Sequence, residues 1–235
     1  MVIDYPGQEL DLFKEAITWK KYFAGKLQPF ISGDVLEVGA GLGETSPYLF
    51  NNTVSSWTAI EPDLGMYVEL KEKIRAGSFP VAYNTLPGTL DSLDQRPAFD
   101  TIIYIDVLEH IEHDSEELRK ASGLLLHGGH LIVLSPAYQW VYNKFDKAIG
   151  HFRRYNRSSL MKAGDHTDLC PQKFFYLDSC GVALLLVNKA LTRESYPTLS
   201  QVKIWDRWFV PVSKIFDRIS GFRFGKTIIG IWTKR

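Results

Sequence analysis

Cysteine is scarce in this 235-residue chain, and neither sign of charge is in excess. Cys170 and Cys180 lack Cys-x-x-Cys spacing and a neighbouring histidine pair, so they form no zinc-site pattern and favour a reduced, cytoplasmic protein. Lys plus Arg and Asp plus Glu each number 27, which gives a net charge of zero. A general nucleic-acid binder normally carries a basic excess, so we expect no nucleic-acid partner.

Long apolar runs are also missing. The longest, Val182 to Val187, is far shorter than the roughly 18 residues that cross a membrane. The first ten residues include Asp4 and Glu9 and lack the apolar centre of a secretory signal. With 45% hydrophobic and 23% charged residues, the composition predicts a single globular domain over residues 1–235 without a transmembrane segment.

Residues 1–30 have the pattern of an amphipathic N-terminal helix that ends at Pro29. Its apolar positions recur at helical spacing along one face, at Leu12, Ala16, Trp19, Phe23 and Leu27.

Residues 34–135 alternate short apolar strands with helical segments. This alternation predicts βαβ units and therefore an α/β, doubly wound, mostly parallel sheet. The expected strands are Val35–Val38, Trp57–Ile60, Pro80–Tyr83, Phe99–Ile105 and His130–Ser135.

The remainder of the chain is less regular. Residues 136–155 are rich in aromatics without a clear period, which favours a functional loop, and residues 136–165 form the expected acceptor-side segment. Within and after this segment, the sequence predicts a short helix at residues 157–164 and a strand at residues 173–177.

Residues 182–221 have helical spacing and form an expected helical insertion before a last strand at 227–232, with Pro211 dividing it into two helices. This insertion either packs on the domain or meets a membrane or a lipid-linked acceptor, and we favour packing.

A glycine-rich turn follows the first predicted strand, in the segment Glu37-Val38-Gly39-Ala40-Gly41-Leu42-Gly43. Closely spaced glycines before a helix let the backbone approach a ligand, although a tight structural turn is the alternative. The spacing is G-x-G-x-G, not that of the dinucleotide fingerprint. Glu61 ends the second strand, where a carboxylate can accept both hydroxyls of a ribose, so a nucleoside-bearing cofactor is indicated.

These segments, together with Ala59–Asp63, Phe99–Ile103, Asp106–Ile111 and Gly128–Val133, resemble the class I S-adenosylmethionine-dependent methyltransferases. The resemblance implies their seven-stranded, Rossmann-like fold, and S-adenosylmethionine as cofactor with S-adenosylhomocysteine as product. It assigns the binding of the methionine part of the cofactor to Glu37, Gly39, Ala40, Gly41 and Gly43. It assigns the ribose to Glu61, beside Pro62, and the adenine to Thr89 and Leu90. Asp106 and Val107 would line the wall of the pocket. Asp106 has a turn or helix cap as its structural alternative.

His110 is the candidate general base, because a neutral imidazole at the edge of the pocket can take a proton from a hydroxyl nucleophile. His151 is the second candidate. The alternative for His110 is a structural turn in which its ring bonds to the backbone. Asp106, His110 and His113 are close in sequence, but no further ligand can be placed beside them, so no metal site is expected.

A second resemblance lies in Gly150-His151-Phe152-Arg153-Arg154-Tyr155, which is similar to a loop of bacterial type 11 and type 12 methyltransferases. Members of that subgroup are often associated with cell-surface glycan or lipid-linked sugar metabolism. The resemblance places Trp140, Tyr142, Arg153, Arg154 and Tyr155 on the acceptor side, and the arginines suit an anionic group. Alternatively, the arginines pair with Asp146 or Asp106 and order the loop.

The sequence therefore predicts methyl transfer to a small-molecule or lipid-linked acceptor. A regulatory module that binds the cofactor without catalysis, a nucleotide-linked oxidoreductase and an RNA methyltransferase are the alternatives. The glycine spacing disfavours the oxidoreductase, and the neutral charge disfavours RNA.

Overall fold

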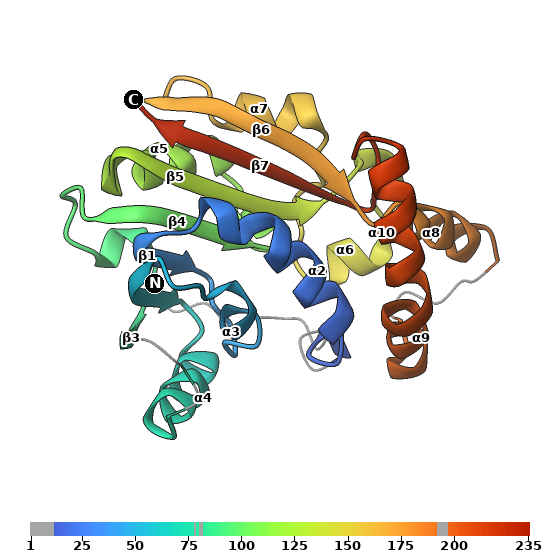
Figure 1. Ribbon diagram of the computed structural model, residues 1–235, viewed down its shortest axis with the longest axis horizontal. Helices are drawn as coiled ribbons and strands as arrows, with labels where there is room; N and C mark the ends of the chain where they lie inside the picture. The colour runs from blue at the N-terminus through green and yellow to red at the C-terminus, as the bar shows by residue number, and fades with distance from the viewer. Residues whose placement is uncertain (1–11, 78, 80–81, 192–196) are drawn as a thin grey trace.

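The computed structural model describes residues 12–77, 79, 82–191 and 197–235. Its centre is a seven-stranded sheet with the order β3-β2-β1-β4-β5-β7-β6, in which β7 runs antiparallel to both of its neighbours (Figure 1). The predicted α/β, mostly parallel fold is confirmed. The strands are β1 (Gly33–Val38), β2 (Val54–Glu61), β3 (Ala82–Pro87), β4 (Phe99–Ile105), β5 (Leu125–Pro136), β6 (Leu169–Leu177) and β7 (Thr227–Lys234).

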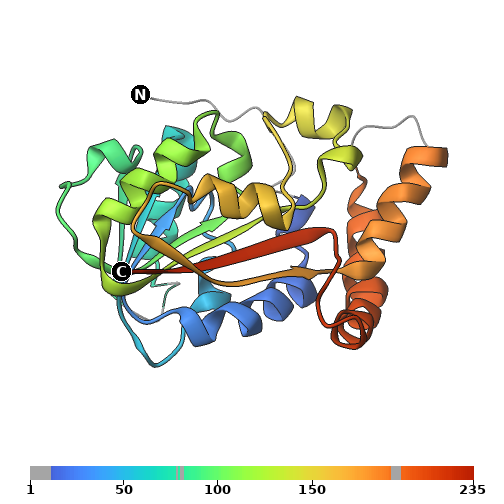
Figure 2. The ribbon, with the colours of Figure 1, turned by 90° about the horizontal axis from the view of Figure 1, so that it is seen from above.

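Helices cover both faces of the sheet, as a parallel sheet requires (Figure 2). One apolar core contains side chains of α2, α3, α4 and α10, and the other contains side chains of α5 and α7. The helices are α2 (Ile17–Leu27), α3 (Ser46–Leu49), α4 (Leu64–Arg75), α5 (Asp114–Leu124), α6 (Lys144–Ala148), α7 (Arg157–Ala163), α8 (Ser179–Leu191), α9 (Leu199–Ile204) and α10 (Val210–Ile219).

The predicted N-terminal helix is present as α2, but it begins at Ile17, after a turn. Trp19, Phe23 and Leu27 are buried against the sheet, as their spacing predicts. A short 3-10 turn that contains Pro29 follows, so the proline ends the helix as expected. Residues 1–11 of the predicted segment lie outside the described residues.

The segment expected to be a loop, residues 136–155, contains the 3-10 turn Gln139–Val141 and the helix α6, whereas the short helix predicted at residues 157–164 is present as α7. Asn143 begins α6 with a capping box in which Asp146 accepts the Asn143 backbone N–H. A five-residue helix is too short to show a periodic pattern, which is why periodicity missed it.

The helical insertion runs from Ser179 to Ile219 and lies at the carboxyl ends of β4, β5 and β6 (Figure 1). Pro211 does not divide it as predicted. A π-helical turn, Trp205–Phe209, joins α9 to α10, and the Val210 N–H bonds to the Trp205 carbonyl. The wider turn places Pro211 in the first turn of α10, where its missing N–H is tolerated.

Buried carboxylates attach this insertion to the rest of the domain. Asp217 of α10 accepts the backbone N–H groups of Asp178 and Ser179 at 2.8 and 2.9 Å and the Tyr22 hydroxyl at 2.9 Å. Asp206 accepts two N–H groups in the first turn of α2, at 2.8 and 3.0 Å. The inner face of the insertion therefore packs on the domain. In the described part of the chain, no helix combines the length and apolarity needed to cross a membrane.

Asp217→Ala is expected to lower the free energy of unfolding by about 3 kcal/mol, because it leaves buried N–H donors without acceptors. Urea denaturation measures the change. Asp165→Ala, at an exposed position, is the matched control and should change stability by less than about 0.5 kcal/mol. Equal effects of the two substitutions would contradict the anchoring role of Asp217.

Candidate functional site

The carboxyl ends of β1, β2 and β4 open into a cavity of about 1470 Å³. The glycine-rich loop lines one part of it, and residues of the loop after α6 and of the helical insertion line another. Carboxyl ends of parallel strands are the usual ligand-binding edge of an α/β sheet. The fold therefore brings the sequence-predicted cofactor loop and the acceptor-side segment into one cavity.

Gly39 adopts a backbone conformation that favours glycine, with φ at 67°. Its N–H donates to the Ile60 carbonyl at 2.9 Å, which continues the pairing of β1 with β2 beyond Val38. A Cβ atom at this position would lie 2.7 Å from a methyl group of Val107. The loop thus requires glycine here because Val107, also in the cavity wall, packs directly against the backbone.

Glu61 lies at the end of β2 with its side chain only 5% exposed. Its carboxylate accepts the Gly41 N–H at 2.8 Å and the Asp63 N–H at 2.9 Å. Burial raises the pKa of Glu61, and the two backbone N–H groups oppose that rise. Glu61 therefore connects the glycine loop to β2 and lines the cavity at the position expected for a ribose.

Glu37 is buried at the end of β1. Its Oε2 atom accepts the Ser46 hydroxyl at 2.6 Å, the Trp57 indole N–H at 2.8 Å and the Tyr83 hydroxyl at 3.4 Å. Burial raises the pKa of Glu37 to about 7, although these three donors act in the opposite direction. Glu37 also lines the cavity.

Most of the predicted cofactor residues line this cavity. They are Glu37, Gly39, Ala40, Gly41, Glu61, Pro62, Thr89, Asp106 and Val107. In the cavity that the described residues form, Gly43 and Leu90 are not part of the wall. Gly43 faces the Leu70 side chain, and Leu90 is fully buried in the apolar core, so the geometry gives both a packing role.

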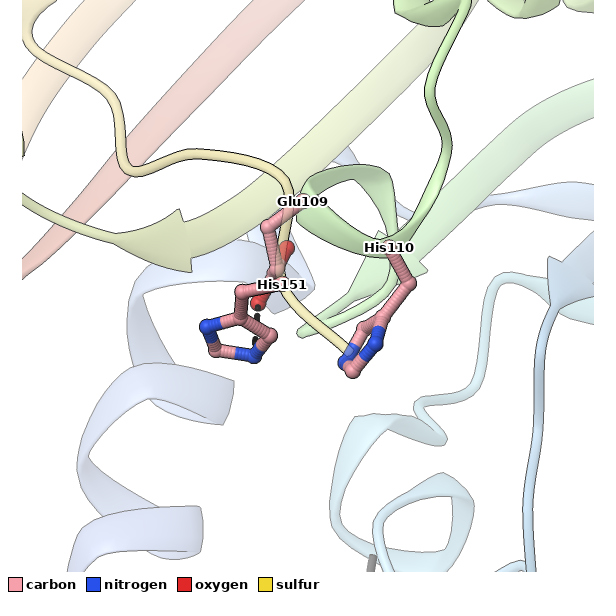
Figure 3. A group of neighbouring side chains, drawn as sticks. All are labelled: Glu109, His110 and His151. Carbon is pink, nitrogen blue, oxygen red and sulfur yellow. Dashed lines mark ion pairs between the residues drawn. The ribbon is translucent and has the colours of Figure 1, made fainter. Parts of the chain in front are cut away.

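His110 and His151, the two candidate bases, meet at the same wall of the cavity (Figure 3). Their ring centroids are 4.5 Å apart and the rings are nearly perpendicular. The structure adds Glu109, whose Oε1 atom is 3.9 Å from Nε2 of His151. The sequence placed no further metal ligand beside His110, whereas in the structure one nitrogen or oxygen atom of each of Glu109, His110 and His151 lies within 4.8 Å of the other two.

The two imidazoles differ in their environment. Burial, together with His151, lowers the pKa of His110 to about 3, so its ring is neutral. Burial also acts to lower the pKa of His151, but the hydrogen bond to Asp146 and the charges of Glu109 and Asp146 raise it overall. Burial and the charge of Asp106 raise the pKa of Glu109.

Arg154 lines the cavity, but its Nε atom donates to Asp146 at 2.8 Å. Arg153 forms an ion pair with Asp114 at 2.9 Å and donates to the Glu112 carbonyl at 2.6 Å. Both arginines therefore order the loop, which was the structural alternative. Whether either also contacts an acceptor stays a prediction.

The predicted aromatic contacts have similar structural functions. The Tyr142 hydroxyl donates to the His151 carbonyl at 2.6 Å, and the Tyr155 hydroxyl donates to Asp114 at 2.8 Å. Tyr155 is 1% exposed, whereas Trp140 is 54% exposed. In the described cavity wall, none of the three side chains takes part. Their acceptor contacts stay predictions.

Sequence reasoning missed the roles of Glu109 and Asp146. Both are fully buried, and both contact His151. A signal for Glu109 existed, because it stands next to His110 in the segment that follows β4, at the carboxyl edge of the sheet where ligands bind. The sequence indicates Asp146 only as a partner of the arginines, because its contact with His151 depends on the capping turn of α6.

Residues 36–131 match the model of a family described as a methyltransferase domain. This match spans less than half of the chain and, together with the fold and the cavity, supports the resemblance of that segment to a class I S-adenosylmethionine-dependent methyltransferase domain. The predicted resemblance is confirmed over this segment.

Among curated proteins, a tRNA U34 carboxymethyltransferase from Methylococcus capsulatus is 30% identical over 122 residues, which cover 52% of this chain and 37% of that protein. A hybrid PKS-NRPS synthetase, lepA, from Aspergillus flavus is 26% identical over 106 residues, 43% of this chain and 3% of that protein. The chain thus spans a minor part of both relatives.

Among solved structures, geranyl diphosphate C-methyltransferase from Streptomyces coelicolor A3(2), in complex with S-adenosyl-L-homocysteine, is similar to this chain with a TM-score of 0.63. The identity is 11%, over 93% of this chain and 77% of that chain. At this identity the similarity shows the shared fold.

Glu37→Gln is expected to reduce the loss of stability with rising pH. The pKa of Glu37 in the folded protein, about 7, lies above its ordinary value of 4.5. Folding therefore favours the protonated acid, and this contribution is complete below the ordinary pKa and is lost as the pH rises through 7. The difference amounts to about 3 kcal/mol at most.

Urea denaturation of the cofactor-free protein at about pH 5 and about pH 8 measures this effect. Wild type should lose more stability between the two conditions than Glu37→Gln. Glu72→Gln, at an exposed position of α4, should behave as wild type. The same pH dependence in wild type and Glu37→Gln would show that Glu37 does not titrate in this range.

Proposed function

We propose that this protein transfers the methyl group of S-adenosylmethionine to a small-molecule or lipid-linked acceptor bound in the same cavity. The observation that carries the proposal is the continuity of the cavity from the glycine loop and Glu61 to His110, His151 and the helical insertion. Its volume, about 1470 Å³, exceeds the range of about 300–1,000 Å³ for a pocket that holds one small ligand. This leaves room for a cofactor and an acceptor together.

The cofactor end fits the nucleoside. Glu61 already uses its carboxylate to accept two backbone N–H groups, and it retains acceptor capacity toward the cavity. Ribose hydroxyls are donors of the kind that such a carboxylate binds at the end of a second strand. Glu37 and the Gly39–Leu42 loop would then lie at the methionine part.

The acceptor end is largely apolar. The insertion contributes Leu184, Val202, Trp205 and Phe209 to the cavity wall. When bound, S-adenosylmethionine supplies a methyl group already activated on its sulfonium, so the chain's own task is to align the acceptor and exclude water. The roles of His110 as base and of His151 as its alternative stay predictions, and an amine acceptor needs neither.

A lipid-linked acceptor is favoured by the outer surface of the same insertion. Five apolar side chains spaced three or four residues apart are exposed there: Ile204, Trp208, Val212, Ile215 and Ile219. Ile204 is 53% exposed and also lines the cavity, so the apolar surface and the cavity are continuous. Exposed apolar stripes of this kind mark contact sites, and the guanidinium of Arg207 lies 5.5 Å from the Trp208 ring, an arrangement suited to a membrane surface.

Glu61→Gln is expected to weaken S-adenosylmethionine binding at least about tenfold, because the amide removes the charge that strengthens hydrogen bonds from the ribose. Calorimetric titration with S-adenosylmethionine and S-adenosylhomocysteine measures the change. Glu72→Gln is the control. Unchanged affinity would disprove the ribose assignment. Absence of cofactor binding by wild type would disprove the proposed activity, whereas binding without methyl transfer would favour the regulatory module.

The double substitution Trp208→Glu with Ile215→Glu is expected to reduce sedimentation with anionic phospholipid vesicles several-fold while cofactor affinity stays unchanged. Val68→Glu, at a position of α4 that is 52% exposed, tests whether any added charge has the same effect. If wild type does not sediment with the vesicles, the acceptor is not presented by a membrane.

A further inference from the structure

Two histidines and a glutamate converge on one point of the cavity wall. Glu109 and His110 belong to the 3-10 turn Leu108–His110, which directly follows β4, and His151 comes from the loop between α6 and α7. One nitrogen or oxygen atom of each side chain lies within 4.8 Å of the other two. Figure 3 shows the three side chains grouped beside the turn.

Each imidazole is held by a contact at one ring nitrogen. The Nδ1 atom of His151 is 2.9 Å from Oδ1 of Asp146. A ring nitrogen of His110 is hydrogen-bonded to the Gly150 carbonyl. A carboxylate or carbonyl in this position fixes the tautomer of an imidazole and leaves its other nitrogen as a lone-pair donor, which is the arrangement found behind metal-binding histidines.

Glu109 is held in the same way through one of its two oxygens. Its Oε2 atom accepts the Ser135 hydroxyl at 2.6 Å. Its Oε1 atom is buried and has no hydrogen-bond partner among the described residues. The nearest ionisable nitrogen, Nε2 of His151, is 3.9 Å away, beyond hydrogen-bond distance. A buried acceptor of this kind is unfavourable unless a proton, a hydrogen-bond donor or a cation satisfies it.

We propose that Glu109, His110 and His151 bind a divalent transition-metal ion, with Oε1 of Glu109 and Nε2 of His151 as two of the ligand atoms. Two atoms that each lie about 2.1 Å from one ion are at most about 4.2 Å apart, so the 3.9 Å separation is compatible with a shared ion. Two imidazoles and one carboxylate suit zinc, iron(II) or manganese and leave coordination positions open. Since all three residues line the cavity, an open position faces the acceptor space.

The ion would give the site a way to bind and polarise an acceptor oxygen. This role rests on the proposed methyl transfer, whereas metal binding itself does not. In the metal-bound protein, His110 and His151 are ligands and no longer proton acceptors.

Calorimetry of the chelator-treated full chain with Zn²⁺, and visible absorption on addition of Co²⁺, test the site. We expect one ion per chain and the absorption bands of Co²⁺ coordinated by nitrogen and oxygen. Glu109→Gln and His151→Ala should each weaken Zn²⁺ binding at least about 100-fold. His127→Ala, which removes an exposed imidazole of β5, should leave it unchanged.

Ser135→Ala provides a milder variant that keeps all three ligands and is less prone to misfold. Losing its hydrogen bond to Glu109 should weaken Zn²⁺ binding about 10-fold. Wild type without a one-to-one Zn²⁺ or Co²⁺ signal would overturn the proposal and leave an ion pair between Glu109 and His151. Equal Zn²⁺ affinity in wild type and His151→Ala would overturn it as well.

Calorimetry with S-adenosylmethionine, carried out with and without Zn²⁺, separates this proposal from the proposed function. Cofactor binding without Zn²⁺ binding would leave methyl transfer standing and remove the metal site. Zn²⁺ binding without cofactor binding would support the metal site and disprove the proposed methyl transfer.

Discussion

The structure depends on how its buried carboxylates are compensated. Seven are less than a tenth exposed among the described residues: Glu37, Glu61, Glu109, Asp146, Asp178, Asp206 and Asp217. A carboxylate removed from water is stable only where donors or cations replace the water. Three of the seven belong to the junction of the insertion with the domain. Asp178, for example, accepts from Ser213, Gly181 and the Trp205 indole, and Lys226 lies 3.3 Å away. At this junction the donors belong to different segments of the chain, so the hydrogen bonds that stabilise the carboxylates also fix the position of the insertion on the domain.

The carboxylates at the strand ends are compensated to different extents. Glu37 receives three side-chain donors, Glu61 two backbone N–H groups, and Glu109 one hydroxyl. Asp146, in α6, also has three partners, since His151 and Arg154 contact one of its oxygens and the Asn143 N–H donates to the other. Of Glu109 and Asp146, which both line the cavity beside His151, Glu109 therefore receives fewer donors. The Oε1 atom of Glu109 can still accept a hydrogen bond or coordinate a ligand. This distinguishes Glu109 from the carboxylates that only stabilise the fold.

Features that depend on residues close together in the sequence could be predicted, and features that depend on contacts between distant segments could not. Strands β1, β2 and β4 and the glycine turn are encoded by short segments, so local patterns predicted the sheet and most of the cofactor wall. Gly43 and Leu90 belong to the same motifs, but their packing against Leu70 and the apolar core depends on elements far along the chain. The group of Glu109 and His151 joins residues 42 positions apart, across β5 and α6. No rule of sequence spacing predicts such a contact. The prediction at Pro211 was wrong because a proline indicates a helix break, whereas the π-helical turn before it lets the helix continue.

This division has a consequence for acceptor choice. The cofactor wall is built from the turns that end β1 and β2, whereas the opposite wall comes from the turn after β4, the loop after α6 and the insertion between β6 and β7. Residues of the insertion can change without moving Glu61 or Gly39. The reason is that the insertion is attached to the domain by Asp178, Asp206 and Asp217, whose hydrogen bonds among the described residues do not involve the turns after β1 and β2. The same sheet can therefore keep one cofactor while the acceptor wall varies in polarity. In this chain that wall combines apolar side chains of the insertion with a polar group of Glu109, His110 and His151, beside which Asp146 and Arg154 also line the cavity. This arrangement suits the proposed amphiphilic acceptor, with its reacting atom at the polar group.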